Sequence, residues 1–160
     1  DYALGSDDGP TRLILMDQIT DPHNVGAILR SAEVFGAQAV IGTQRHCAPE
    51  TGALAKSASG ALERQPYLRL RNLSDTIITL QKMGFLVLGL DSSADQSVDK
   101  VACAHADRQI ALVFGAEGPG LRQRTKETVD MLVSIPCSRG FGSLNVSNAA
   151  AVALYAMRQS

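Results

Sequence analysis

The chain has 160 residues, of which 45% are hydrophobic and 19% charged, and its formal net charge is −1. This length and composition are typical of one globular domain with an ordinary core, and they exclude a disordered chain. No apolar run approaches the ~20 residues of a membrane-spanning helix. The near-neutral charge also lacks the basic signature of a stand-alone nucleic-acid-binding protein.

Short apolar runs alternate with helical patterns along the whole chain. Strands are predicted at residues 13–16, 39–42, 67–70, 85–90, 110–114 and 131–135. Helices are predicted at residues 22–35, 50–62, 74–83, 125–129 and 145–158, the second of them weak and rich in Ala and Ser. The polar stretch 91–107 predicts a loop with a minor strand or turn. This alternation predicts an α/β fold on a mostly parallel sheet.

Several boundaries have a chemical explanation. Asp21 followed by Pro22 is typical of a helix start, because Asp caps and Pro suits the first helical position. Gly36 is expected to end that helix, and Ser74 is expected to cap the helix at 74–83. Pro136 is expected to stop the last strand.

The cysteines and histidines do not form metal or disulfide patterns. Cys47, Cys103 and Cys137 are widely separated, odd in number and without a C-x-x-C pair. This spacing argues against a disulfide framework or a zinc site, so we expect no metal and a reducing cytoplasm. The three histidines are equally scattered.

Three polar clusters follow predicted strands, where α/β proteins form ligand sites. They are residues 17–24 with Arg30 in the next helix, residues 115–120 with Glu117, and residues 138–149. Each also has a plain structural explanation: a capped helix, a tight turn, and a helix cap with a loop before it. Taken singly, none of them identifies a function.

The common nucleotide-binding and hydrolase motifs are absent. A dinucleotide fingerprint needs G-x-G-x-x-G between the first strand and helix, and residues 17–24 contain no glycine. A Walker-type phosphate loop is missing, and the Gly142-Ser143 pair does not continue as a G-x-S-x-G elbow. The sequence therefore excludes the standard Rossmann interpretations.

Together, the three clusters resemble the SpoU (TrmH) family of RNA ribose methyltransferases. Residues 21–32 (DPHNVGAILRSA) resemble its first motif, residues 114–121 (FGAEGPGL) its second, and Ile135-Pro136 with residues 143–149 (SLNVSNA) its third. Order and spacing match over almost all of residues 12–159. The closest pattern is that of the 23S rRNA guanosine 2'-O-methyltransferase branch.

The resemblance implies a SPOUT-type α/β fold: a mostly parallel sheet flanked by helices, with a C-terminal deep trefoil knot. It also implies a homodimer with the active site near the subunit interface. A separate observation agrees, because residues 149–157 are nine consecutive apolar residues. A helix apolar on every side needs covering on more than one face.

The implied reaction is methyl transfer from S-adenosyl-L-methionine to a ribose 2'-hydroxyl of RNA. By resemblance, the cofactor is held near Gly115, Gly118, Ile135, Pro136 and Leu144. The implied catalytic residues are Arg30, Asn24, Glu117, Ser143 and Asn145. Asn24 and Glu117 are expected to orient Arg30 and the loops, and Ser143 and Asn145 to position the RNA.

Arg30 is the family's candidate for helping the hydroxyl lose its proton. A guanidinium stays protonated at neutral pH, so we expect it to stabilise the developing alkoxide or to hold the adjacent phosphate, with proton removal elsewhere.

Residues 1–10 (DYALGSDDGP) are acidic, and they lack an initiator Met and the parts of a signal peptide. We expect them to be a linker or tail from an upstream RNA-binding domain, with residues 11–160 as the catalytic domain. The expected partners are RNA, in particular rRNA, and a second copy of the chain, with no membrane.

Three alternatives remain open: a tRNA 2'-O-methyltransferase, another SPOUT reaction such as base methylation, and a non-enzymatic RNA-binding module that kept the fold. The presence of all five candidate catalytic residues favours an enzyme. Asn24 and Arg30 together with the Ser143-Leu144-Asn145 run favour ribose as the target.

Overall fold

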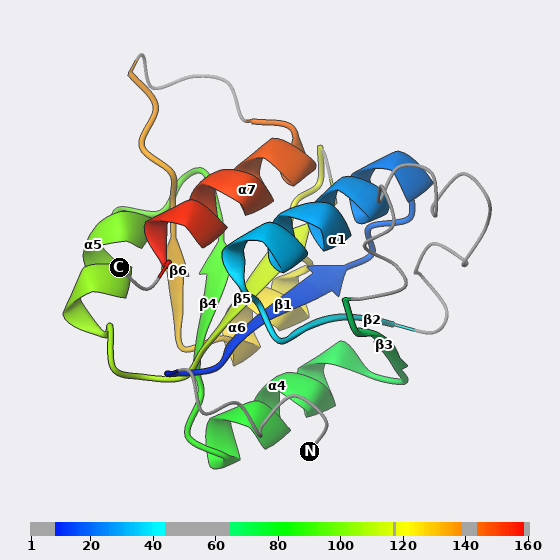
Figure 1. The fold of residues 1–160 in the computed structure, drawn as a ribbon, viewed down its shortest axis with the longest axis horizontal. Helices are drawn as coiled ribbons and strands as arrows, with labels where there is room; N and C mark the ends of the chain where they lie inside the picture. Colours follow the sequence, from blue (N-terminus) through cyan, green and yellow to red (C-terminus); the bar gives the residue numbers. More distant parts are fainter. Residues whose placement is uncertain (1–8, 44–64, 117, 139–143, 159–160) are drawn as a thin grey trace.

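A computed structural model describes residues 9–43, 65–116, 118–138 and 144–158 of the chain (Figure 1). Its strands are β1 (Arg12–Asp17), β2 (Ala39–Thr43), β3 (Tyr67–Leu70), β4 (Leu86–Leu90), β5 (Ile110–Gly115) and β6 (Met131–Val133). Its helices are α1 (Pro22–Phe35), α4 (Leu73–Lys82), α5 (Val98–Ala104), α6 (Gln123–Thr128) and α7 (Val146–Ala156). The described strands form a six-stranded sheet in the order β3-β2-β1-β5-β4-β6. Every neighbouring pair is parallel, which confirms the predicted α/β class.

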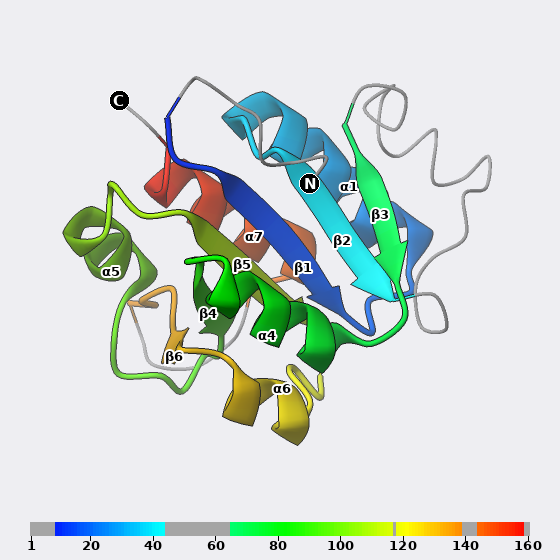
Figure 2. The same ribbon diagram turned by 90° about the horizontal axis from the view of Figure 1, so that it is seen from below.

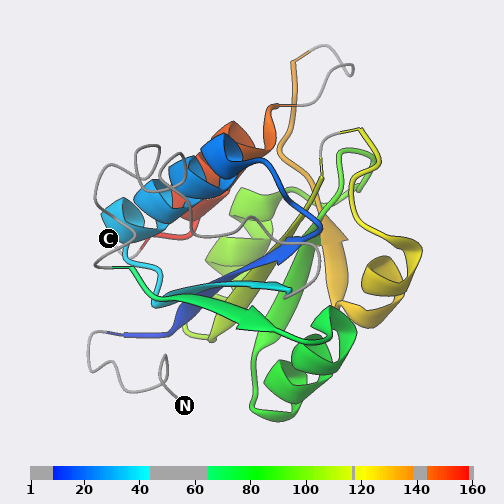
Figure 3. The ribbon, with the colours of Figure 1, turned by 90° about the vertical axis from the view of Figure 1, so that its right-hand side faces the viewer.

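Helices cover both faces of this sheet. α1, α5 and α7 lie on one face, and α4 and α6 lie on the other (Figures 2 and 3). Alternate residues of β1 enter different cores: Ile14 packs in the cluster that includes α1 and α7 residues, and Leu15 in the cluster that includes α4 residues. Both faces of β1 are therefore buried, which explains why its sequence is a continuous apolar run rather than an alternating one.

The face of the sheet to which each strand's following helix leads determines where a ligand site can open. β5 continues into α6, on the same face as α4, whereas β4 leads to α5 and β6 leads to α7, on the opposite face. The neighbouring strands β5 and β4 thus send their chains to opposite sides of the sheet. In open α/β sheets such a divergence opens a crevice at the carboxyl ends of the strands.

The ends of α1 follow the predicted chemistry, whereas α7 begins one residue later and ends two residues earlier than the predicted 145–158. The carboxylate of Asp21 accepts a hydrogen bond from the backbone N–H of His23 at 2.9 Å, and Gly36 ends α1 at a φ of 79°. Asn145 caps α7, because its Oδ1 accepts from the backbone N–H of Ser147 at 2.9 Å.

The predicted cap of α4 was wrong. Asn72, not Ser74, is the N-cap, and its side chain accepts from the backbone N–H of Asp75 at 3.1 Å. With the cap two residues earlier, Leu73 becomes the first helical residue and is buried in the core. α6 likewise begins before the predicted Thr125, at Gln123.

The loop predicted over residues 91–107 was also wrong, because it contains α5. The side chain of Ser97 caps this helix, and Val98, Val101 and Ala102 form its buried stripe. Only these three side chains of the short helix are buried, so the periodic signal is weak, and their burial depends on a neighbouring helix, since α5 packs against α7. β6 ends at Val133 rather than at Ile135. The helix predicted at 50–62 lies outside the described residues.

Candidate functional site

A cavity of about 220 Å³ opens where β4, β5 and β6 end. Its apolar wall includes Leu90, Phe114, Leu121, Ile135, Leu144 and Val146. The loop that follows β5 forms another wall, through Gly115, Ala116, Gly118, Pro119 and Gly120. These segments are far apart in the sequence and meet because the parallel strands end at one edge of the sheet. The cavity therefore lies at the crevice that the diverging connections create.

The loop after β5 needs its glycines for its own shape. A Cβ atom on Gly115 would lie 2.2 Å from the carbonyl carbon of Gly120, closer than any real contact. The backbone N–H of Gly120 donates to the carbonyl oxygen of Ala116 at 2.8 Å, and this bond closes the turn. Gly118 and Gly120 have φ angles of 83° and 69°, which side chains rarely adopt. The loop thus folds back on the end of β5 and presents main chain to the cavity.

A buried carboxylate anchors the far end of this loop. Asp17, the last residue of β1, has a fully buried side chain. Its Oδ1 lies 2.6 Å from Nε of Arg122, and its Oδ2 accepts from the backbone N–H of Arg122 at 2.9 Å. Charge-assisted bonds of this kind are among the strongest in proteins. Asp17 therefore ties the start of α6 to the end of β1, and the loop between Gly115 and Arg122 is fixed at both ends.

An ion pair forms the charged part of the cavity lining. Asp91 directly follows β4, and Lys126 lies in α6; Nζ of Lys126 is 3.5 Å from Oδ2 of Asp91. The other oxygen of Asp91 accepts from the backbone N–H and the hydroxyl of Ser93. These two bonds are the main reason that the pKa of Asp91 is lowered. Burial opposes them, and the positive charge of Lys126 lowers the pKa further by a smaller amount.

Four of the five predicted cofactor-binding residues line this cavity: Gly115, Gly118, Ile135 and Leu144. Pro136 follows Ile135 and is not among the described lining residues. The structure thus brings together residues of the second and third motifs. Their role toward a cofactor stays a prediction.

The predicted catalytic residues of the first motif lie elsewhere. Neither Asn24 nor Arg30 is among the described residues that line the cavity. Nδ2 of Asn24 donates to Asp21 at 3.4 Å, and Nη1 of Arg30 lies 3.0 Å from Oε1 of Glu33. The Arg30 side chain is 49% exposed on the surface of α1. Eight residues beyond Pro22, it lies about 12 Å along the helix from the carboxyl edge of the sheet.

The remaining predicted catalytic residues are less informative. Asn145 caps α7 beside Leu144 and Val146, which both line the cavity. Glu117 and Ser143 lie outside the described residues.

Sequence reasoning missed Asp91 and Lys126, and it assigned no role to Asp17 or Arg122. Asp17 and Asp91 share a signal that could have found them, since each is an acidic residue at or just after the end of a buried strand. Their basic partners carry no comparable signal, because α6 was predicted only as a short helix.

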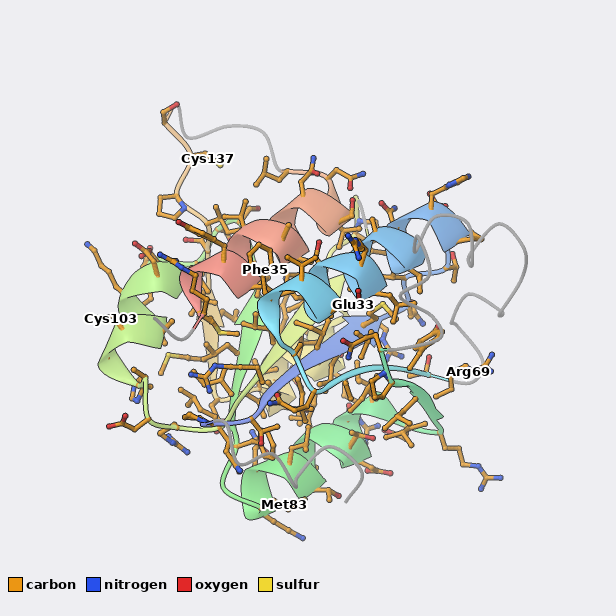
Figure 4. All side chains as sticks on the ribbon, in the orientation of Figure 1. Glu33, Phe35, Arg69, Met83, Cys103 and Cys137 are labelled. Carbon is orange, nitrogen blue, oxygen red and sulfur yellow. The ribbon has the colours of Figure 1, made fainter. Side chains whose placement is uncertain are left out.

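In the described ranges, no three His, Cys, Asp or Glu side chains gather into a group that could hold a metal ion. No helix in that part of the chain is long and apolar enough to span a membrane. Cys103 and Cys137 are exposed, on α5 and after β6 (Figure 4). Cys47 lies outside the described residues.

Comparison with known proteins decides the family. Residues 11–155 match the model of the SpoU rRNA Methylase family. The chain belongs to the SpoU rRNA methylase family. The resemblance to the SpoU family that the sequence indicated is thereby confirmed. Residues of the second and third predicted motifs line the cavity.

Two curated SpoU relatives carry the same name, 23S rRNA (guanosine-2'-O-)-methyltransferase RlmB. The protein from Ralstonia nicotianae is 44% identical over 160 residues, covering 99% of this chain and 63% of the relative. The protein from Bordetella pertussis is 41% identical over 155 residues, covering 97% of this chain and 62% of the relative. This SpoU chain thus spans somewhat less than two thirds of the length of these relatives.

Solved SpoU structures share the fold. The SpoU methyltransferase AviRb from Streptomyces viridochromogenes has a TM-score of 0.83 at 27% identity, covering 92% of this chain and 58% of that protein. Its complex with the cofactor AdoMet has a TM-score of 0.83 at 25% identity, covering 96% and 61%.

Proposed function

We propose that this SpoU chain transfers a methyl group from S-adenosyl-L-methionine to a ribose 2'-hydroxyl of RNA, at a guanosine of 23S rRNA. The observation that carries the proposal is the cavity, because its walls are built from the second and third SpoU motifs. The proposed substrate follows from the names of the relatives at 44% and 41% identity, and the proposed cofactor follows from the AviRb complex with AdoMet.

The residues of the cavity fit such a cofactor. Phe114, Ile135 and Leu144 offer an apolar slot for the faces of an adenine ring. The loop at 115–120 offers main-chain groups at close range, since its glycines carry no side chains. The bound cofactor supplies an electrophilic methyl group. The chain itself has to orient the cofactor, exclude water and bring the ribose hydroxyl into line.

Arg30 is the residue that we propose to act on the RNA. Its guanidinium would stabilise the negative charge that develops on the ribose oxygen, or hold the neighbouring phosphate. Glu33 holds it on the exposed side of α1, away from the described cavity wall. This position fits a site completed at a subunit interface, where Arg30 meets the RNA bound at the partner's cavity.

A homodimer is the second part of the proposal. Val34 on α1 and Val152 and Tyr155 on α7 are 57%, 43% and 53% exposed. The two helices pack side by side (Figure 4). The ring of Phe35 contacts that of Tyr155 edge-on, with 5.9 Å between the ring centroids. We call Val34, Val152 and Tyr155 the α1–α7 apolar face. A second copy covering it would bury the side of α7 that the chain leaves open.

The trefoil knot and the domain organisation are also proposals. Leu144 and Ala149 come from the segment after β6, yet they line a cavity together with the ends of β4 and β5. This supports a C-terminal segment that passes the loop after β5, as a knot requires. Residues 11–160 would be the catalytic domain, because the family match begins at residue 11. An upstream RNA-binding domain joined by residues 1–10 would supply affinity that a net charge of −1 does not.

The test uses the full-length protein and has two stages. Calorimetry should detect S-adenosyl-L-methionine binding. Transfer of labelled methyl groups to unmodified rRNA, followed by mapping of 2'-O-methylated nucleotides, should identify one guanosine of 23S rRNA. Methylation of tRNA alone would favour the tRNA alternative, and methylation of a base would favour another SPOUT reaction. A protein that binds no cofactor would be a non-enzymatic module. Activity on rRNA would also place the protein in the cytoplasm, where ribosomes are assembled.

The role of Arg30 has its own test. We expect Arg30→Ala to bind S-adenosyl-L-methionine normally while its rate of methyl transfer falls at least a hundredfold, the scale of losing one transition-state donor. Glu33→Gln is the matched control, because it removes the ion-pair partner and keeps the guanidinium. Near-normal turnover of Arg30→Ala would contradict the role.

A further inference from the structure

Asp91 and Lys126 are the charged residues among the described cavity lining, and the remaining lining residues are apolar, glycine or weakly polar. They approach the cavity from different elements, one from the end of β4 and one from α6. Their side chains are 15% and 34% exposed, so neither is fully desolvated.

The main chain holds Asp91 in place. Its backbone N–H donates to the carbonyl oxygen of Val133 in β6 at 2.9 Å. Its own carbonyl oxygen accepts from Ala94 at 3.0 Å, which closes a turn. Its Oδ1 accepts two bonds from Ser93, at 2.9 Å from the backbone N–H and 2.8 Å from the hydroxyl. The carboxylate is therefore fixed, and Oδ1 is fully engaged.

The second oxygen is engaged much less. Oδ2 faces Nζ of Lys126 at 3.5 Å, beyond the ~2.9 Å of a good N–H···O bond. An ion pair of this length between partly exposed side chains contributes little to stability. Stability alone therefore does not account for a fixed carboxylate that presents a nearly unused acceptor at a cavity wall.

The charges of this pair indicate which ligand group it suits. Asp91 and Lys126 together are electrically neutral, so the wall attracts neither a free cation nor a free anion strongly. An ammonium group would compete with Lys126 for Oδ2, and a carboxylate would face Asp91. A hydroxyl group has neither problem, because it can donate to Oδ2 and accept from Nζ at the same time. A vicinal diol offers two such groups.

We propose that Asp91 and Lys126 bind the ribose hydroxyls of the nucleoside cofactor and thereby position it in the cavity. This proposal rests on the proposed function, since it takes the cavity to be the S-adenosyl-L-methionine site. It names Asp91 and Lys126 as binding residues outside the three SpoU motifs.

The decisive experiment compares ligands on the wild-type protein. S-adenosylhomocysteine and its 2'-deoxy and 3'-deoxy analogues are titrated by calorimetry into the full-length protein. We expect at least one deoxy analogue to bind about tenfold or more weakly, the scale of one lost bond to a charged group. Equal affinity for all three ligands would overturn the proposal. Failure of the wild-type protein to bind S-adenosylhomocysteine or S-adenosyl-L-methionine would instead overturn the proposed function.

A second comparison assigns the hydroxyl to Asp91. Asp91→Asn should reduce the affinity for S-adenosylhomocysteine to that of the wild-type protein for the deoxy analogue that binds more weakly. In this variant, removing the same hydroxyl from the ligand should reduce the affinity little further. Asp95→Asn is the control, because Asp95 is exposed in the same loop and is not among the described lining residues. If the substitution and the missing hydroxyl each reduced the affinity by their full amount, and the two losses added in the combined measurement, the assignment would be overturned. Thermal unfolding checks that Asp91→Asn is folded, and Lys126→Met repeats the comparison from the other partner.

Discussion

At the scale of single residues, two carboxylates organise the edge of the sheet where the cavity lies. Asp17 is fully buried and binds Arg122 through both oxygens, whereas Asp91 is partly exposed and keeps one oxygen almost unused. Burial separates their roles. A fully buried carboxylate needs hydrogen-bond partners for both of its oxygens, so Asp17 is structural. A carboxylate with spare capacity at a cavity wall can bind a ligand.

Arg122→Ala should lower the free energy of unfolding by about 2–3 kcal/mol, because Asp17 then stays buried with only a backbone N–H as partner. Urea denaturation measures the loss. Arg124→Ala is the control, since Arg124 is exposed in α6, the helix that begins directly after Arg122, and we expect a change within about 0.5 kcal/mol. Equal effects of the two substitutions would show that the Asp17–Arg122 pair contributes nothing specific.

The lowered pKa of Asp91 predicts a pH dependence. A carboxyl group with a lower pKa in the folded than in the unfolded protein stabilises the fold above its unfolded pKa of about 3.8. That contribution is lost as the pH falls through the folded pKa. The wild type should therefore melt above Asp91→Asn at pH 7, and the difference should shrink below about pH 4. A difference that is unchanged in acid would contradict the assignment.

At the scale of elements, the loop after β5 depends on main-chain packing more than on its side chains. Gly115 lies under the backbone of Gly120, so a methyl group there has to displace main chain. Gly89, in the neighbouring strand β4, offers a contrast. A Cβ atom on it would meet Cδ1 of Leu121 at 2.9 Å and Cδ2 of Leu132 at 3.0 Å, which are ends of flexible side chains.

Gly115→Ala should therefore weaken S-adenosylhomocysteine binding at least tenfold, because the loop can no longer close over the end of β5. It should also lower the free energy of unfolding by about 1–3 kcal/mol. Gly89→Ala, the matched control, should change stability by less and leave binding nearly intact. Calorimetry and urea denaturation give both quantities, and normal ligand binding by Gly115→Ala would refute the role assigned to the loop.

At the scale of the whole molecule, the open question is how the chain covers α7. The described part of one chain buries Val146, Ala150, Ala153 and Leu154 of this helix and leaves Val152 and Tyr155 exposed. Together with Val34, these residues form the α1–α7 apolar face. Arg30 lies one helical turn before Val34, so a partner seated on this face would also come close to Arg30.

Val152→Asp should convert a dimer into monomers in sedimentation velocity, because it places a charge in the proposed interface. Its methyl-transfer rate should fall with it if Arg30 acts across the interface. Ile78→Asp is the control: Ile78 is 41% exposed on α4, on the opposite face of the sheet, and its loss should leave assembly unchanged. A wild-type monomer, or a Val152→Asp dimer, would refute the interface.

Much of the fold could be predicted because its signals are local. Continuous apolar runs indicated β1, β2, β4 and β5, since both faces of the sheet are covered there. β3 gave a weaker pattern, because it contains Arg69 and its residues are half-buried or exposed. Asp21, Pro22 and Gly36 set the ends of α1 because caps act over one turn. The misses are the cases where a neighbour decides: α5 becomes a helix by packing on α7, and α4 starts at Leu73 because Leu73 is buried.

The sequence by itself determined the α/β class and, through three motifs at the right spacing, the family. Only the tertiary structure decided which residues share the cavity. It joined the second and third motifs at one sheet edge, added Asp91 and Lys126, and left Asn24 and Arg30 out of the described cavity wall. The physical reason is that strand and helix signals depend on near neighbours, whereas a cavity depends on which chain segments end at the same edge of the sheet.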